Sequence, residues 1–224
     1  MTEVLTFMPT ALAVVALVLV IGQCRKPGGW VGRFSAWLMG VRHAGVTTWG
    51  LSHLVLAPQF AILDVDCGGG AAIERLAAIA SQGTVQGIDY SSASVATARS
   101  RNRTAIAEGR VEIQQASVSA LPFGECTFDL VTAVETHYYW PEPATDLLEI
   151  LRVLKPGGRL AIIAETYRGQ TLGALMMVPM MLLRARYLTV EEHRQLFMSA
   201  GFSDVHVDTD ARKGWICVVG RRPE

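Results

Sequence analysis

Hydrophobic positions divide the chain into three stretches that differ in spacing. The first, residues 4–22, carries no charged residue and ends in an unbroken apolar run over 11–21. The second, residues 30–41, repeats apolar side chains at helical spacing, and the third, from Phe60 onward, alternates short apolar runs with helical stretches. The pattern predicts an apolar leader over 1–24, a helical segment over 25–59 and an α/β domain over 60–224.

The leader has about the minimum length that spans a bilayer core. Glu3 precedes it and Arg25 and Lys26 follow, so a spanning helix would leave the rest of the chain on the cytoplasmic side. No basic residue precedes the apolar run, which disfavours a cleaved signal peptide. We therefore expect a membrane anchor. The alternative is a helix that packs on the domain or on a second copy, with Pro9 in its first turn.

The second stretch predicts an amphipathic helix that forms a lid outside the sheet. Its apolar positions are Trp30, Phe34, Trp37, Leu38 and Val41, with Arg33 and Arg42 between and after them. Tryptophan and arginine side chains suit the headgroup layer of a membrane. The alternative is that this face packs on the catalytic domain.

The third stretch predicts a doubly wound, mostly parallel sheet with helices between its strands. The expected strands are residues 61–65, 84–89, 111–116, 128–134 and 159–165. After a predicted helix over 189–200, residues 205–210 and 214–220 predict an antiparallel hairpin at the edge of the sheet.

Composition narrows the class of protein. The 224 residues suffice for one catalytic domain, and 50% are hydrophobic while 18% are charged. The formal net charge is +0 and no run of basic residues occurs, so nucleic acid is not an expected partner. The four cysteines lack metal-ligand spacing, so no zinc site, disulfide framework or other metal is expected. A mean hydropathy of +0.30 is high for a chain without lipid contact.

Candidate chemistry concentrates where the first strand, ILDV, runs into DCGGG and then a helix. Glycines there allow positive φ angles, and the helix N-terminus offers free N–H groups to a ligand. Asp89 ends the next strand, roughly 20 residues further on, where a carboxylate binds the ribose hydroxyls of a nucleoside. The alternative is that Asp89 only caps the following helix. Nicotinamide and flavin folds use a related loop.

Several motifs in order resemble the class I methyltransferases, specifically the methyltransferase type 11 group. They are ILDVDCGGG, GIDYS, SALPF, FDLVTAVETHYYWPEP, LRVLKPGGRL and AGFSDV, and the likeness extends from about Lys26 to Arg222. The segment LMGVRHAGVTTWGLSHL resembles the lid of a bacterial subgroup. The resemblance implies S-adenosylmethionine as the cofactor.

The resemblance also implies which residues contact the cofactor. Asp64, Gly68 and Gly70 would surround its methionine part, Asp89 would hold the ribose, and Tyr90 would lie against the adenine. Ser117 and Val118 would meet the adenine edge, although many relatives have an acidic residue in place of Ser117. Val134 and Glu135 would face the methyl-donor end.

Asp66 stands where the family usually has glycine. A carboxylate there would crowd the cofactor and lie near its own carboxylate, although it could also attract the ammonium or the sulfonium. Reduced affinity is the natural expectation. The alternative function is therefore a catalytically silent, membrane-tethered domain that binds S-adenosylmethionine.

Catalysis by this class requires mainly that an acceptor be aligned with the methyl group while water is excluded. A base is needed only if the acceptor carries a proton that must leave. Glu135, His137 and Tyr139 follow a strand end at the cofactor side and are the expected catalytic residues. The alternative is that the tyrosines pack and His137 is an ordinary imidazole. His43 and His53 of the lid are weaker candidates.

The acceptor is expected to be a small, lipophilic molecule, methylated by direct in-line displacement. Residues 171–183 are apolar and rich in methionine, in the region where this class builds acceptor pockets. They could instead form a second membrane-facing patch or ordinary core. A nicotinamide-dependent oxidoreductase, the remaining alternative, does not account for LPF, LKPGG or the terminal hairpin.

Overall fold

The computed structural model describes residues 28–170 and 173–224. The predicted leader, residues 1–24, lies outside the described residues, so the expected membrane anchor stays a prediction. Within the described ranges no helix is both long and apolar enough to cross a membrane.

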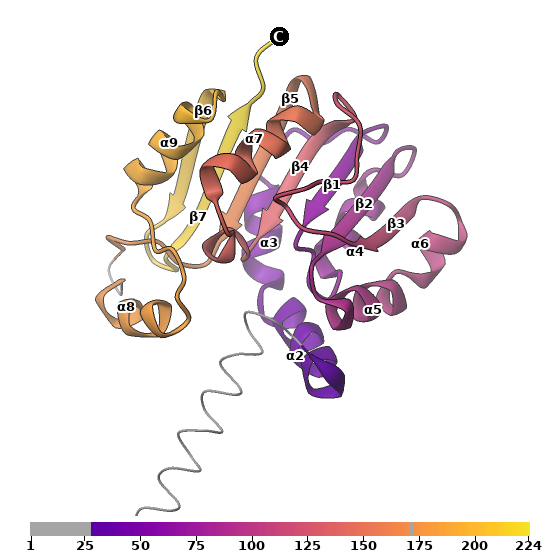
Figure 1. Ribbon diagram of the computed structural model, residues 1–224, viewed down its shortest axis with the longest axis horizontal. Coiled ribbons are helices and arrows are strands. Elements are labelled where there is room, and N and C mark those ends of the chain that lie inside the picture. Colours follow the sequence, from indigo (N-terminus) through magenta and orange to yellow (C-terminus); the bar gives the residue numbers. More distant parts are fainter. Residues whose placement is uncertain (1–27, 171–172) are drawn as a thin grey trace, which may run out of the picture.

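A seven-stranded sheet in the order β3-β2-β1-β4-β5-β7-β6 forms the centre of the molecule (Figure 1). The strands are β1 (Ala61–Val65), β2 (Thr84–Asp89), β3 (Val111–Gln115), β4 (Phe128–Val134), β5 (Leu154–Ala164), β6 (Ser203–Asp210) and β7 (Trp215–Arg221). The first five strands are parallel to one another, and β7 is antiparallel to both β5 and β6. The predicted α/β fold with a C-terminal antiparallel hairpin is confirmed.

The hairpin lies at the edge of the sheet, with its two strands in the reverse of their order in the chain. The antiparallel strand β7 lies between β5 and β6, and β6 is the edge strand. Burial explains this order, because Ile216, Cys217 and Val218 of β7 are fully buried in succession, whereas β6 contains no buried residue. A strand that is buried on both faces belongs inside a sheet. The fifth strand also begins earlier than expected, at Leu154.

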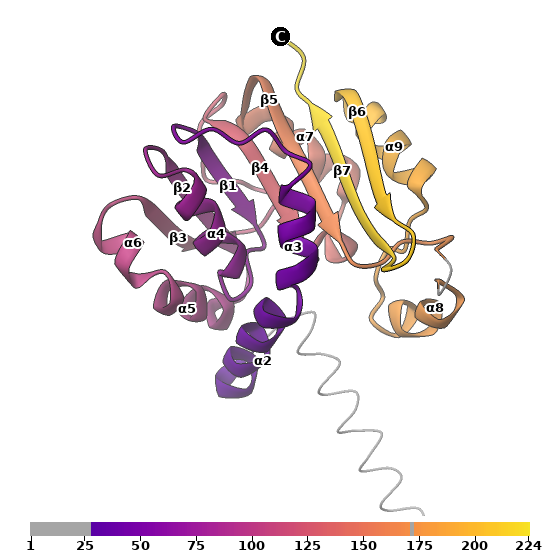
Figure 2. The same cartoon turned by 180° about the vertical axis from the view of Figure 1, so that it is seen from behind.

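Helices cover both faces of the sheet. They are α2 (Gly29–Arg42), α3 (Ala44–Leu51), α4 (Ala71–Ile79), α5 (Ser92–Arg101), α6 (Arg103–Ala107), η1 (His137–Tyr139), α7 (Pro143–Val153), α8 (Gly173–Leu182) and α9 (Val190–Ser199). Helices α3, α4 and α5 contribute to one hydrophobic core and α7 and α9 to the other (Figures 1 and 2). The predicted helix over 189–200 is α9, which Thr189 and Glu192 begin with a reciprocal capping box.

Successive residues of each inner strand point to opposite cores. In β5, Ile162 joins the core under α7 and α9, whereas Ile163 joins the core under α3. Gly50 lets α3 lie against this strand, because a Cβ atom at Gly50 would stand 2.5 Å from Ile163 Cγ2. The lid is thereby packed on the same sheet that carries the site.

The helix predicted in the lid segment corresponds to α2, and its large apolar side chains point outward. Trp30 is 82% exposed and Phe34 60%, whereas the buried residues of α2 are Gly32 and Ala36. The interpretation that the aromatic face packs on the catalytic domain is therefore wrong. Small residues form the inner face because α2 approaches the glycine loop closely.

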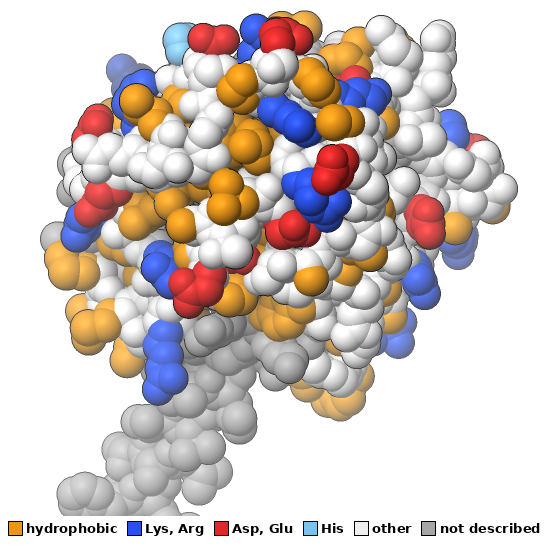
Figure 3. All heavy atoms as spheres, turned by 45° about the horizontal axis from the view of Figure 1, so that its top comes forward, with side chains coloured by type: hydrophobic (Ala, Val, Ile, Leu, Met, Phe, Trp, Pro, Cys, Tyr) orange, Lys and Arg blue, Asp and Glu red, His pale blue; other side chains and the backbone are white. Residues whose placement is uncertain are grey.

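Charged side chains of both signs are interspersed on the face that Figure 3 brings forward. This face shows no continuous area of one sign.

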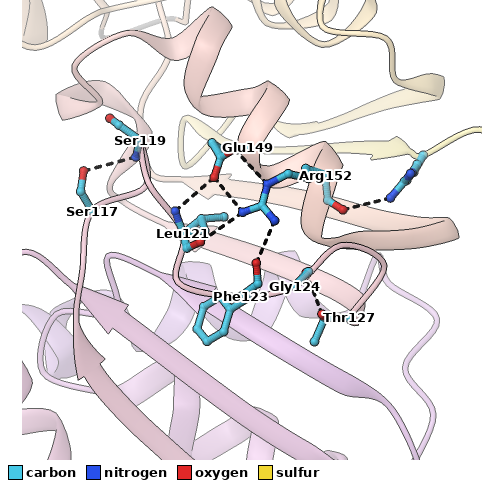
Figure 4. A network of polar contacts seen from close by, with 9 residues as sticks. Ser117, Ser119, Leu121, Phe123, Gly124, Thr127, Glu149 and Arg152 are labelled. Atoms are coloured by element: carbon cyan, nitrogen blue, oxygen red, sulfur yellow. Dashed lines mark hydrogen bonds and ion pairs between the residues drawn. The ribbon is translucent and has the colours of Figure 1, made fainter.

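Arg152 of α7 holds the loop that leads into β4 (Figure 4). Its guanidinium donates to both oxygens of Glu149, to Phe123 O at 2.8 Å and to Leu121 O at 3.1 Å. Glu149 in turn accepts from Leu121 N at 3.2 Å. The planar fork of arginine makes these contacts at once, which a lysine ammonium cannot do.

We therefore expect Arg152→Lys to lower the free energy of unfolding by about 1–2 kcal/mol, because the loop carbonyls lose their donors. Urea denaturation followed by circular dichroism measures the change, with the exposed Arg212→Lys as the matched control. An Arg152→Lys variant as stable as the control would show that the network does not stabilise the loop.

Candidate functional site

A cavity lies at the carboxyl ends of β1, β2 and β4 and is closed on one side by the lid. Its lining comes from α2 and α3, the loop after β1, the start of α4, the end of β2 and the residues after β4. The ends of neighbouring parallel strands form the usual ligand site of such sheets. The lid prediction is thus supported by Met39, His43 and Thr47, which line the cavity together with Asp64 and Asp89.

The three glycines after β1 have different roles. Gly68 has φ +53 and lines the cavity. A Cβ atom at Gly69 would stand 2.6 Å from Ala36 O, so Gly69 allows the backbone of α2 to pass directly over the loop. Gly70 has φ +75 and begins α4, where a Cβ atom would meet Asn102. Gly70 is not among the residues that line the cavity, and its contact with a ligand stays a prediction.

Asp89 connects two loops through its carboxylate. Oδ2 accepts from Gly68 N at 2.9 Å and Oδ1 accepts from Ser91 N at 2.7 Å. The cap of α5 is Ser91, whose hydroxyl accepts from Ser94 N, so helix capping does not require Asp89. Asp89 is buried and lines the cavity, and burial raises its pKa. A carboxylate has about four acceptor positions, so two remain for a ligand.

Asp64 lies deeper, at the end of β1. It is 1% exposed, and Thr132 of β4 donates a hydrogen bond to its Oδ1 at 2.6 Å. Burial raises the pKa of Asp64 to about 7, while the Thr132 hydroxyl opposes this shift. Asp64 also lines the cavity, as predicted.

Asp66 is accommodated by a left-handed backbone with φ +52, a conformation that aspartate tolerates better than most residues. Its Oδ2 accepts from the Trp140 indole N–H at 2.9 Å. Burial, followed by the charge of Asp89, raises the pKa of Asp66 to about 8. The side chain lines the cavity, and its raised pKa lowers the negative charge, and so the repulsion, below that of an ordinary aspartate.

Glu135 follows β4 with φ +62 and lines the cavity. One of its oxygens accepts from Glu165 N, and the Tyr138 hydroxyl donates to the other at 3.4 Å. Burial raises the pKa of Glu135 to about 7, and the charge of His43 acts in the opposite direction. A carboxyl group with a pKa near neutrality suits proton transfer.

His43 brings the lid to the same place. Its Nε2 lies 3.6 Å from Glu165 Oε1, and Arg42 also pairs with Glu165. Burial raises the pKa of Glu165, but the stronger combined effect of His43 and Arg42 lowers it overall. His43, a weaker candidate on the sequence, is therefore better placed than His137. In the sequence, the feature that could have identified His43 is the helical spacing of apolar residues that predicts the lid.

Ligand atoms of His43, Glu135 and Glu165 lie within 4.8 Å of one another, a spacing that a metal ion can bridge. Arg42 already supplies a positive charge to Glu165, and the Glu165 N–H occupies Glu135. The cluster thus joins the lid, through Arg42 and His43, to Glu165, which directly follows β5.

His137, one of the predicted catalytic residues, is not among the residues that line the cavity. It is 3% exposed, and its Nε2 lies 3.0 Å from Nε2 of His193 on α9. Burial lowers the pKa of both imidazoles, so both are neutral at pH 7. The pair packs η1 against α9. Tyr139, by contrast, lines the cavity as expected.

Of the three residues predicted to contact the adenine, one lines the cavity and two do not. Tyr90 lines the cavity, whereas Ser117 and Val118 are not among the lining residues. Val118 is 2% exposed and belongs to the core, and the Ser117 hydroxyl accepts from Ser119 N at 3.2 Å. Ser117 belongs to the loop of Figure 4, and the adenine contacts of Ser117 and Val118 stay predictions. Val134 lines the cavity as predicted.

This fold and this site together define the class I S-adenosylmethionine-dependent methyltransferases. Residues 63–162 match the family described as a methyltransferase domain. S-adenosylmethionine is the cofactor of the class.

Relatives agree with this assignment over part of their length. The chain is 40% identical over 101 residues to O-methyltransferase cnsE of Penicillium expansum, which is 45% of this chain and 36% of the relative. It is 33% identical over 123 residues to demethylmenaquinone methyltransferase of Lactiplantibacillus plantarum, 54% of this chain and 52% of the relative. The match thus spans about a third to a half of these relatives.

The same fold occurs in a methyltransferase of Haloferax volcanii that was solved with the Trm112 methyltransferase activator. The TM-score is 0.73 at 22% identity, over 85% of this chain and 94% of that one. At this identity the likeness concerns the fold alone.

Raised pKa values at the site predict a pH-dependent stability. Asp64, Asp66 and Glu135 hold protons in the folded chain that they would release on unfolding at the same pH. Their contribution is complete below about pH 4 and is lost as the pH rises through 7 to 8. Without cofactor, the thermal midpoint of unfolding should therefore decrease as the pH is raised from 7 to 8.5. The buried imidazoles of His137 and His193 affect stability only at lower pH, because their pKa values are lowered.

Scanning calorimetry of the wild type and Glu135→Gln measures this effect. The glutamine cannot release a proton, so its midpoint should fall less over the same interval. A wild-type midpoint that rises between pH 7 and 8.5 would contradict the assignment of raised pKa values.

Proposed function

We propose that this protein transfers the methyl group of S-adenosylmethionine to a small, lipophilic acceptor. The observation that carries the proposal is the placement of Asp89 beside the Gly68 loop, inside a cavity that the lid closes. The family match over residues 63–162 supports the choice of cofactor.

The residues of the cavity fit this cofactor. Asp89 retains acceptor positions for the two ribose hydroxyls, and Tyr90 offers a ring beside it. Three acidic side chains, Asp64, Asp66 and Asp89, complement a ligand that carries an ammonium and a sulfonium. Gly68 and Gly69 leave room for the close approach of the backbone.

When bound, the cofactor supplies a methyl group that is already activated by the sulfonium. The chain's own residues then hold the acceptor in line and exclude water, for which the lid residues Met39 and Thr47 are placed. Glu135 accepts the proton of an acceptor that carries one, and Glu165 N positions its carboxylate. Tyr139 lies beside it and borders the acceptor.

Calorimetric titration and an assay for S-adenosylhomocysteine formation test these roles separately. Asp89→Ala should weaken S-adenosylmethionine binding by about thirty- to several-hundred-fold, because two hydrogen bonds to a charged group are lost. Glu135→Gln should keep the cofactor affinity and lower turnover of a protic acceptor about a hundredfold or more.

The control is Asp204→Ala, which removes a 74% exposed carboxylate from β6. Binding without turnover over a panel of phenols, carboxylates and isoprenoid quinols would favour the silent binding domain. If Asp89→Ala binds S-adenosylmethionine as the wild type does, the proposed cofactor site is wrong.

Two exposed apolar helices support a lipophilic acceptor and a position at a membrane. Trp30 and Phe34 of α2 and Met181 and Leu182 of α8 are each at least 60% exposed. Helices α2 and α8 lie at the same end of the molecule, beyond the carboxyl ends of the parallel strands (Figures 1 and 2). Side chains of this kind bind the boundary between headgroups and acyl chains.

Charge on this side favours anionic lipid. A groove between α2 and α5 is lined by the apolar Phe34, Trp37 and Val41 together with Arg33, Arg101 and Glu74. Because Arg101 pairs with Glu74 at 3.5 Å, these three charged groups sum to one positive charge. We place the cytoplasmic face of a membrane against α2 and α8. An acceptor dissolved in the bilayer would then reach the lid without crossing water. The demethylmenaquinone methyltransferase among the relatives supports an acceptor of this polarity.

The triple variant Trp30→Ser, Phe34→Ser, Trp37→Ser should lower the partition of the full chain onto phosphatidylserine-containing vesicles about tenfold or more, because its buried apolar area is lost. Vesicle co-sedimentation measures the bound fraction. Val55→Ser, which changes a 71% exposed side chain between α3 and β1, is the control. A triple variant that binds like the wild type would exclude α2 as the membrane contact.

A further inference from the structure

Asp66 introduces a carboxylate into a part of the cavity where the family has glycine. Its backbone is left-handed, its Oδ2 accepts from the Trp140 indole, and its side chain lines the cavity. Among the described residues, no donor reaches its Oδ1. Trp140 therefore holds the carboxyl group in place while one oxygen stays available to a ligand.

Acidic residues dominate the charges around this carboxylate, and the basic group in the same lining is the His43 imidazole. Asp64, Asp89 and Glu135 line the same cavity, and no lysine or arginine of the described chain does so. Burial and the charge of Asp89 raise the pKa of Asp66 to about 8. The charged form is thus unfavourable in the empty cavity, and a positively charged ligand would relieve the repulsion.

We propose that Asp66 selects the charge of the cofactor and, as a carboxylate, favours S-adenosylmethionine over S-adenosylhomocysteine. The inference rests on the proposed function. The two ligands share the adenosine, the ammonium and the carboxylate, and they differ by one methyl group and one positive charge on sulfur. A carboxylate in the cavity acts on this difference in charge, whereas a glycine does not.

Selection of this kind has a consequence for turnover. Loss of the sulfonium charge when the methyl group leaves would restore the repulsion among Asp66, Asp64 and Asp89. The product would therefore be held less tightly than in a cavity with glycine at this position. Asp66 then serves release of the product, which is the opposite of a defect in the site.

The ratio of the two affinities should depend on pH. The acidic groups that act on Asp66 are Asp89, Asp64 and Asp146, and the Trp140 N–H is its neutral partner. The nearby Cys67 thiol has a raised pKa, because burial disfavours its thiolate. Selectivity for S-adenosylmethionine should rise between pH 6.5 and 8.5 as Asp66 loses its proton.

Asp66→Asn is the matched variant. Asparagine tolerates a left-handed backbone, and its Oδ1 can accept from the Trp140 indole, so the variant removes the charge and keeps the shape. Asp66→Gly restores the residue that is usual in the family and removes both. Thermal midpoints establish that each full-length variant is folded.

Calorimetric titration at pH 8.5 and 6.5 gives the ratio of the S-adenosylhomocysteine to the S-adenosylmethionine dissociation constant. At pH 8.5 the ratio should be about tenfold higher in the wild type than in Asp66→Asn or Asp66→Gly, as one added charge interaction implies. At pH 6.5 the three proteins should converge.

Equal ratios in the wild type and either folded variant at pH 8.5 would overturn the inference while leaving the proposed function standing. The inference would also be overturned, with the proposed function intact, if the variants bound both ligands more tightly by one common factor. Asp66 would then weaken the binding of both ligands equally and would not distinguish their charges. If no folded variant binds S-adenosylmethionine, the proposed function fails and the inference fails with it.

Discussion

Asp89 connects the carboxyl ends of β1 and β2 through hydrogen bonds that its two oxygens accept from Gly68 N and Ser91 N. Because the carboxylate is buried, losing either donor would leave an acceptor without a partner. The glycine loop, the start of α5 and the floor of the cavity are therefore positioned by one side chain. The same hydrogen bonds hold the Asp89 carboxylate in a fixed position in the cavity lining, where it can accept hydrogen bonds from a ligand.

Close approach of the lid is the second condition for the site. The α2 backbone passes over Gly69 at a distance that admits no side chain, and Ala36 is the residue that meets it. This contact requires small residues on the inner face of α2, so the aromatic residues occupy its outer face. The same helix thus closes the cavity with one side and presents Trp30 and Phe34 outward with the other.

Much of the fold was predictable from the chain because apolar runs define the strands and the glycines define the loop after β1. Asp89 was predictable for the same reason, since its position at a strand end follows from the pattern. Hydrophobic periodicity identifies a helical face but not its direction, so it left the orientation of α2 open. The order of β6 and β7 depends on burial of both faces of β7, which alternation alone does not reveal.

Side chains after β4 show where local sequence is insufficient. Glu135, His137 and Tyr139 all lie within five residues of the strand end, yet Glu135 and Tyr139 line the cavity whereas His137 is buried against α9. The partner of His137 is His193, on a helix far along the chain, and no local motif predicts that contact. His43 enters the site for the converse reason, because the lid folds back over the sheet.

A crystal structure of the full chain with S-adenosylhomocysteine tests the central claim most directly. We predict that the ligand lies between α2 and the loop after β1, with both ribose hydroxyls within hydrogen-bond distance of the Asp89 carboxylate. A ligand bound elsewhere, or a ribose that does not contact Asp89, would contradict the account.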